Sequence, residues 1–302
     1  MQSSQHSHKS YVQGLILSIL SYLLWGFFPL YWKMLTQVPA EQILAHRIIW
    51  SFVLLALIVF ALRNKLVRGY LKNIKVLGTL FITAIIIAIN WGVYIYAVNN
   101  NQIVEASLGY YINPIVIVIF AIIFLKERMN RLEILAIVFA LAGIVYLTVE
   151  VGRLPVISLL LATSFAVYAL LRKKANLQSM AGLMIETMIL APIALGYLLL
   201  VDHNGTGAFG HISTWITVLL ILAGPVTTLP LYLFGIAAPK IPLSTTGFIQ
   251  YLSPSIQLVL GVVLYSEPFT HPELVSFTLV WVGLGFYTFS LIGGLRNKRA
   301  AT

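Results

Sequence analysis

Ten long apolar stretches occupy most of the chain and leave only short connections between them. A helix needs roughly 20 apolar residues to cross the hydrocarbon core of a bilayer. Only 9% of the 302 residues are charged, against about 25% in soluble domains, so lipid must cover the surface. The stretches are 11–33, 41–62, 74–98, 102–125, 132–149, 154–172, 178–201, 213–237, 242–265 and 273–295. The sequence therefore predicts an all-α integral membrane protein with ten transmembrane helices.

The basic residues concentrate in every second connection, notably at 63–75, 126–131, 172–174 and 296–299. The intervening loops keep only Arg153. Because Lys and Arg are retained on the cytoplasmic side of a membrane, the polar tails 1–10 and 296–302 are both predicted to be cytoplasmic. The net charge of +10 is thus a topology signal, and no nucleic-acid partner is expected.

Several functional classes lack their sequence signatures. The chain has no Cys, which excludes disulfides, thiolate metal sites and Cys nucleophiles. It also has no phosphate-binding loop of the GxxxxGK[ST] type, no HExxH zinc pair and no GxSxG nucleophile elbow. We therefore expect a protein that is not an enzyme and that carries no cofactor or metal.

A shift of 140 residues aligns the second half of the chain with the first. Identical residues coincide at Tyr111/Tyr251, Pro114/Pro254, Glu127/Glu267, Glu133/Glu273 and Gly143/Gly283. This match predicts two five-helix repeats, at 11–150 and 154–295. Because five is odd, the second repeat enters the membrane from the opposite side, and the repeats are inverted. Inverted repeats are typical of secondary transporters, where they allow two states that open to opposite faces.

Three segments resemble the RarD branch of the EamA family, in the drug/metabolite transporter superfamily. They are Trp-Gly-Phe-Phe-Pro-Leu-Tyr-Trp-Lys at 25–33, Ile-Leu-Ala-His-Arg-Ile-Ile-Trp at 43–50, and Pro-Leu-Ser-Thr-Thr-Gly-Phe-Ile-Gln-Tyr at 242–251. The resemblance covers residues 11–295. It implies a bacterial inner-membrane permease with a central cavity between the two halves.

Three ionisable residues lie inside predicted helices, where a charge is costly and by default faces a cavity or a partner. Arg47 is a candidate to bind an anionic or carboxylate group of the substrate, unless its long side chain extends to the outer interface. Its neighbour His46 is either a titrating gate or a hydrogen-bonded structural residue. Glu186 coincides with His46 under the 140-residue shift. It is either a proton carrier or a member of a structural pair, and on the first reading Glu186→Gln abolishes proton-coupled transport without unfolding the protein.

The other candidates for the substrate pathway are aromatic or polar residues within or at the ends of helices. Aromatic rings bind cationic or planar solutes, and proline kinks free backbone carbonyls for a hinge or a binding site. Packing, interfacial anchoring and plain architecture are the alternatives, and Lys33 fits the anchor. These candidates are Trp25, Tyr31, Lys33, Asn90, Tyr94, Tyr111, Asn113, Tyr232, Gln250 and Tyr251, with helix kinks at Pro114, Pro230 and Pro254. Glu127 and Glu267 end their helices and are expected to cap or to form ion pairs.

Together these features predict a multi-pass permease that moves a small organic metabolite or drug-like solute by alternating access. Either a proton gradient or the gradient of the solute drives it, and both a monomer and a homodimer fit. Two alternatives remain open. One is an intramembrane enzyme acting on a lipid-linked substrate, with His46 and Glu186 as acid and base, and the other is a passive channel.

Overall fold

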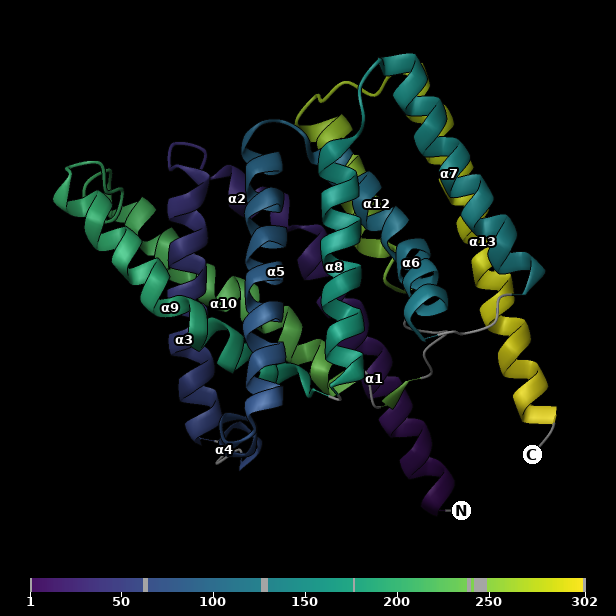
Figure 1. The fold of residues 1–302 in the computed structure, drawn as a ribbon, viewed down its shortest axis with the longest axis horizontal. Helices are drawn as coiled ribbons and strands as arrows, with labels where there is room; N and C mark the ends of the chain where they lie inside the picture. The colour runs from purple at the N-terminus through teal and green to yellow at the C-terminus, as the bar shows by residue number, and fades with distance from the viewer. Residues whose placement is uncertain are drawn as a thin grey trace.

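The computed structural model describes residues 2–61, 65–125, 130–175, 177–237, 240–241 and 249–300. Within these ranges the regular structure is helical (Figure 1). The helices are α1 (Gln2–Gly26), α2 (Phe28–Lys33), α3 (Ala40–Ala61), α4 (Lys65–Lys72), α5 (Ile74–Asn99), α6 (Ile103–Leu125), α7 (Arg131–Val151), α8 (Val156–Lys174), α9 (Ser179–His203), α10 (Thr214–Ala237), α12 (Leu252–Val259), the π-helix η2 (Leu260–Leu264) and α13 (His271–Ala300).

Eight helical segments in the described part are long and apolar enough to cross a membrane. The predicted stretches 154–172 and 242–265 correspond to two shorter apolar helices, Val156–Arg172 and Leu252–Leu264. The structure thus establishes a multi-pass membrane protein, whereas the count of ten spans stays a prediction. Both termini lie toward the end of the molecule that carries α4 (Figure 1), as the charge pattern predicts for two tails on one side.

One local prediction was wrong, and the two polar tails, for which no secondary structure was predicted, are largely helical. Residues 63–73 read as a basic loop, but Lys65–Lys72 form the helix α4. It is fixed from outside, because Val67 is buried and the Tyr70 hydroxyl accepts a hydrogen bond from the Gln178 amide at 3.0 Å. The polar ends also continue as helix, since α1 begins at Gln2 and α13 extends to Ala300.

The first predicted span is interrupted at Phe27, between α1 and α2. Pro29 stands in the first turn of α2, and a proline has no N–H to donate to the carbonyl four residues earlier, here that of Trp25. The side chain of Gln257 on α12 donates to this carbonyl instead, at 3.1 Å. The break in the helix thus supplies a contact between the two halves of the sequence.

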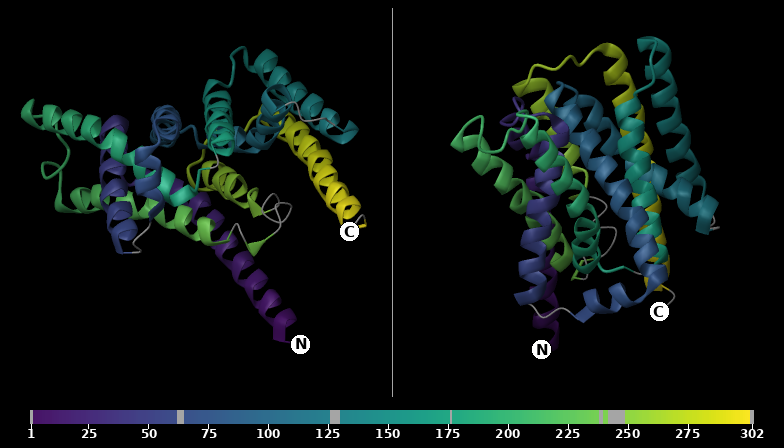
Figure 2. Two further views of the ribbon diagram at one scale, coloured as in Figure 1. Left: turned by 60° about the horizontal axis from the view of Figure 1, so that its bottom comes forward. Right: turned by 60° about the vertical axis from the view of Figure 1, so that its left-hand side comes forward.

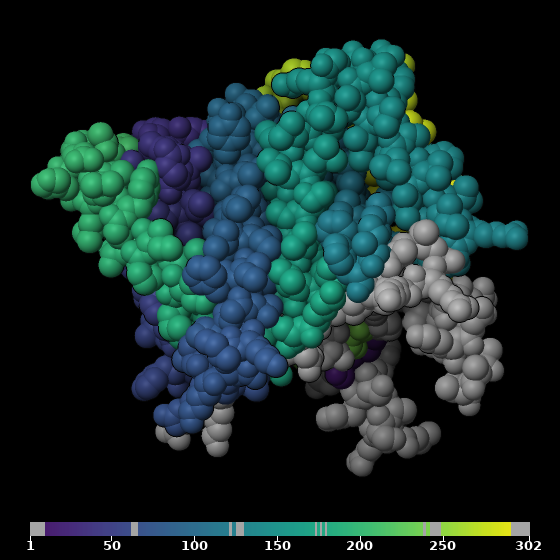
Figure 3. All heavy atoms as spheres, in the orientation of Figure 1, coloured from purple at the N-terminus to yellow at the C-terminus, as the bar shows by residue number. Residues whose placement is uncertain are grey.

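The helices pack in sets that the 140-residue shift exchanges. α6 packs on α8 as α12 packs on α1, and α5 packs on α8 as α10 packs on α1. α7 and α13, whose positions correspond under the shift, lie side by side (Figure 2). In the space-filling view α5 and α8 are neighbours on one face of the molecule (Figure 3). Large apolar side chains that point outward, such as Phe60 and Val263, suit contact with lipid.

The α7–α13 contact is reciprocal at the level of single residues. A Cβ atom on Gly143 would lie 2.9 Å from the Ser276 carbonyl oxygen, and one on Gly283 would lie 2.8 Å from that of Ala136. Each pair becomes the other when 140 is added to or subtracted from its numbers. Glycine at both positions therefore permits the close approach of the two helices.

Candidate functional site

Arg47 lies two turns into α3 and is only 4% exposed. Its guanidinium Cζ is 4.1 Å from the ring centroid of Trp91, 5.1 Å from that of Trp32 and 6.0 Å from that of Phe28. Aromatic faces stabilise a desolvated cation by about 2 kcal/mol. Arg47 therefore does not extend to the interface but is enclosed by α2, α3 and α5.

The side chains around Arg47 have hydrogen-bond donors without acceptors. Nε and Nη1 of Arg47, Nε1 of Trp32 and the Tyr94 hydroxyl are buried and have no hydrogen-bond partner among the described residues. Arg47 forms no salt bridge with a carboxylate of the described residues. A buried donor without a partner costs about 1–3 kcal/mol. We call Phe28, Trp32, Arg47, Trp91 and Tyr94 the Arg47 box.

The residues beside the box have structural partners. The Tyr31 hydroxyl donates to the Leu219 carbonyl on α10. The Lys33 ammonium donates to the Asn101 side chain and lies 5.0 Å from the ring centroid of Tyr265. These contacts connect α2 to the segments that follow α5 and η2.

His46 lies on a different side of α3 from Arg47, because adjacent residues of a helix point about 100° apart. Its ring stacks on Phe209 with centroids 4.9 Å apart and planes at 20°. Gln42 holds this connection between α9 and α10 in place, since its amide donates to Thr206 and accepts from Ala208, both at 2.9 Å. The α9–α10 connection therefore covers His46.

Glu186, on α9, is completely buried, and both of its carboxylate oxygens accept hydrogen bonds. Its carboxylate accepts from Thr83 at 2.6 Å, from Tyr168 at 3.0 Å and from Arg172 at 2.9 and 3.1 Å. Arg172 also donates to the Tyr168 hydroxyl and to the Gln178 carbonyl. The geometry is that of a structural ion pair, and a proton-carrier role for Glu186 stays a prediction. We call Thr83, Tyr168, Arg172 and Glu186 the Glu186 cluster.

Sequence reasoning missed the role of Arg172, which was counted as a charge of the connection at 172–174. The residue lies in the last turn of α8, and its side chain, 10% exposed, is bonded to α9. The 140-residue shift could have drawn attention to Arg172, because it places Arg172 on Trp32 and Tyr168 on Phe28. Both of these first-half residues lie beside the buried Arg47.

The predicted asparagine candidates join helices. Asn90 on α5 donates to the Leu161 carbonyl at 3.1 Å and to the Ser164 hydroxyl at 2.9 Å. Asn113 on α6 donates to the Ala162 carbonyl at 3.1 Å. Both amides therefore bind the middle of α8.

Tyr111, Tyr251 and Glu267 also lie at contacts between helices or their connections. The Tyr111 hydroxyl lies 2.6 Å from that of Ser255, and its ring stacks 6.2 Å from that of Tyr251. Glu267 accepts from the backbone N–H of Val104 at 2.8 Å and so caps the start of α6, a different helix from the one that it was predicted to end. Glu127 lies outside the described residues. Trp25, Tyr232 and Gln250 are half-buried.

The three proline positions differ. Pro114 and Pro230 lie well inside α6 and α10, and a kink at each of them stays a prediction. Pro254 lies in the first turn of α12, which begins at Leu252 after a turn formed by Gln250 and Tyr251. In a first turn a missing N–H leaves no helical bond unmade. Residues 242–248 of the predicted helix 242–265 lie outside the described residues.

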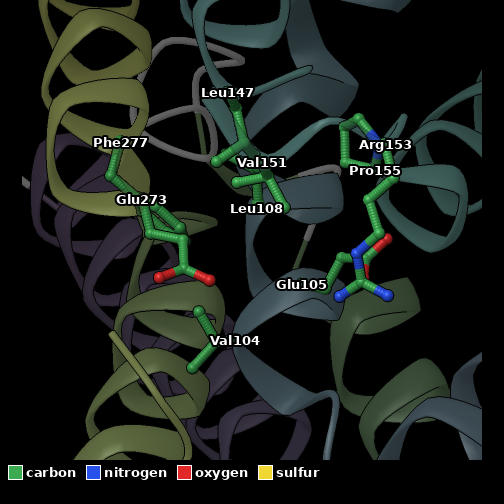
Figure 4. Close-up of a pocket in the computed structure, with 9 residues that line it drawn as sticks. All are labelled: Val104, Glu105, Leu108, Leu147, Val151, Arg153, Pro155, Glu273 and Phe277. Atoms are coloured by element: carbon green, nitrogen blue, oxygen red, sulfur yellow. The ribbon is translucent and has the colours of Figure 1, made fainter. Parts of the chain in front are cut away.

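A small cavity near the start of α6, the end of α7 and the start of α13 contains no residue of the Arg47 box in its lining, which Figure 4 shows. Its lining includes Glu105, Arg153 and Glu273, with Leu108, Val151 and Phe277. Its volume of about 40 Å³ suits one water molecule, whereas sites for organic ligands occupy roughly 300–1,000 Å³. This cavity is therefore too small to hold the solute in the present conformation.

The comparisons with known proteins agree with this membrane architecture. The model of the EamA-like transporter family matches residues 12–149. The chain is 45% identical to the uncharacterized transporter YojE of Bacillus subtilis, over 97% of this chain and 99% of the relative. It is 39% identical to protein RarD of Escherichia coli K12, over 93% of this chain and 95% of the relative.

The chain belongs to the EamA-like transporter family. Within that family it is a RarD-type member. A solved crystal structure with 17% identity shares the fold of this EamA protein, with a TM-score of 0.59 over 92% of this chain and 98% of that one.

Proposed function

We propose that this EamA-family protein is a secondary transporter that moves a small organic solute across the bacterial inner membrane. Ten helices in two inverted five-helix repeats alternate between an inward-open and an outward-open state. The solute gradient or a proton gradient supplies the driving force. Family membership and the transporter relatives support transport itself.

The observation that carries the proposed mechanism is the reciprocal packing of the two halves. The Gly143–Ser276 and Gly283–Ala136 approaches exchange under the 140-residue shift, and so do the helix contacts on α1 and α8. A pair of inverted repeats that packs in this way has a second state in which the halves exchange conformations. The break between α1 and α2 at Phe27 adds support, because transporter sites are commonly formed by discontinuous helices.

The enzyme alternative has less support in the geometry. It requires His46 and Glu186 to act on one substrate as acid and base. His46 stacks on Phe209, whereas Glu186 is bonded to Arg172, Tyr168 and Thr83. The two candidates thus have different partners on different elements.

Counterflow distinguishes the three classes. Proteoliposomes loaded with an unlabelled bacterial metabolite extract are placed in an isotopically labelled extract, and the lumen is analysed by mass spectrometry. We expect labelled solute to enter unchanged in mass, with saturable kinetics, and liposomes without protein serve as the control. Linear, non-saturating flux would indicate a channel, and a changed mass an enzyme. Repeating the assay with and without a pH gradient tests proton coupling.

A further inference from the structure

The Arg47 box and the Glu186 cluster share two positions, and a third position beside the box, under the 140-residue shift. The 140-residue shift places Tyr168 on Phe28, Arg172 on Trp32 and Glu186 on His46. Each site thus consists of a ring and a second side chain one turn later, packed against the buried part of the next span. Each site also surrounds a guanidinium.

The two sites differ in one group: the Glu186 cluster contains a carboxylate, and the Arg47 box does not. In the Glu186 cluster a resident carboxylate accepts hydrogen bonds from an arginine, a tyrosine and a threonine. In the Arg47 box the corresponding residue is His46, which turns toward Phe209. The donors Nε and Nη1 of Arg47, Nε1 of Trp32 and the Tyr94 hydroxyl therefore remain buried without an acceptor among the described residues.

We propose that the Arg47 box binds a carboxylate group of the transported solute, in the role that the Glu186 side chain has in the other half. A guanidinium stacked on a ring keeps its N–H bonds in its own plane, where a carboxylate accepts two of them side by side. The Trp32 N–H and the Tyr94 hydroxyl add two donors, and the rings contact the apolar part of the solute. The proposal rests on the proposed transport function and names the class of its substrate.

Binding to the purified protein in detergent tests this assignment without transport. The probes are acetate, succinate and benzoate, each beside its uncharged amide, together with inorganic phosphate. Tryptophan fluorescence reports binding because Trp32 and Trp91 line the box, and the melting temperature provides a second readout. We expect at least one carboxylate to bind, its amide to bind at least tenfold more weakly, and Arg47→Gln to weaken the carboxylate at least tenfold.

Tyr94→Phe separates a loss of binding from a folding defect, because it removes only a hydroxyl that has no hydrogen-bond partner. We expect it to retain the melting temperature of the wild type and to bind the carboxylate several-fold more weakly. Arg153→Gln, at an exposed arginine, is the matched control and should bind normally. Three results would overturn the proposal: equal binding of acid and amide, phosphate binding as tight as that of every carboxylate, or no carboxylate binding at all.

The failure of this inference and that of the proposed function have different signatures. Counterflow that proceeds while no carboxylate competes with it leaves a transporter with another substrate class. Carboxylate binding that depends on Arg47 in a protein without counterflow leaves an anion site without transport.

Discussion

Glu186→Gln is expected to lower the free energy of unfolding by about 3–5 kcal/mol, because breaking a buried ion pair leaves an uncompensated charge. The Arg172 side chain is 10% exposed and that of Glu186 is 0% exposed, so water does not replace the lost carboxylate. The hydrogen bonds of Thr83 and Tyr168 to the carboxylate weaken in the same variant. Denaturant titration in detergent, followed by circular dichroism, measures the loss.

Two controls define this result. Asp202→Asn breaks the exposed pair with His211, whose side chains are 58% and 63% exposed, and we expect a change below about 1 kcal/mol. The double variant Glu186→Gln/Arg172→Gln removes both charges and should recover part of the stability. A Glu186→Gln protein as stable as Asp202→Asn would contradict the structural pairing. It would favour the proton-carrier role predicted from the sequence.

Gly143→Ala and Gly283→Ala are each expected to destabilise the protein by about 1–3 kcal/mol through overpacking. Each new methyl group would lie within 3 Å of a backbone carbonyl oxygen of the facing helix, so α7 and α13 must move apart. Because the two approaches are reciprocal, we expect similar losses, measured by the same titration.

Gly285 supplies the matched control, since it lies on α13 two positions from Gly283 and a Cβ there would meet nothing within 4 Å. Gly285→Ala should be neutral or stabilise by up to about 1 kcal/mol, the difference in helix propensity. Equal effects at positions 283 and 285, or a large loss at only one of 143 and 283, would contradict the reciprocal interface.

Hydropathy predicted the membrane fold because long apolar runs have few alternatives in water. The breaks within those runs were harder to predict from the sequence. The interruption at Phe27 depends on Gln257, more than 200 residues away, to satisfy the Trp25 carbonyl. The helix α4 was not predicted because its basic residues suggested a loop, whereas the burial of Val67 and the Tyr70–Gln178 hydrogen bond depend on tertiary contacts.

The candidate site was predictable in part. Arg47 was identified because a charge in an apolar run is costly. Its enclosure was not, because Trp32 and Trp91 come from separate helices. The carboxylate of Glu186 was found without Arg172, since a basic residue at a helix end reads first as a topology signal. Comparing the two halves residue by residue shows that Arg172 corresponds to Trp32, a residue beside Arg47.

Alternating access between inverted repeats is the central claim, and distances between spin labels test it most directly. The chain has no Cys, so pairs of cysteines can be introduced without background labelling. The exposed residues Lys72 and Arg131 form one pair, and the 140-residue shift converts them into Ile212 and His271, which are also exposed. Pulsed electron resonance should show two distances for each pair in nanodiscs. Conditions that lengthen the distance in one pair should shorten it in the other, whereas distances that stay single, or that lengthen together in both pairs, would contradict the account.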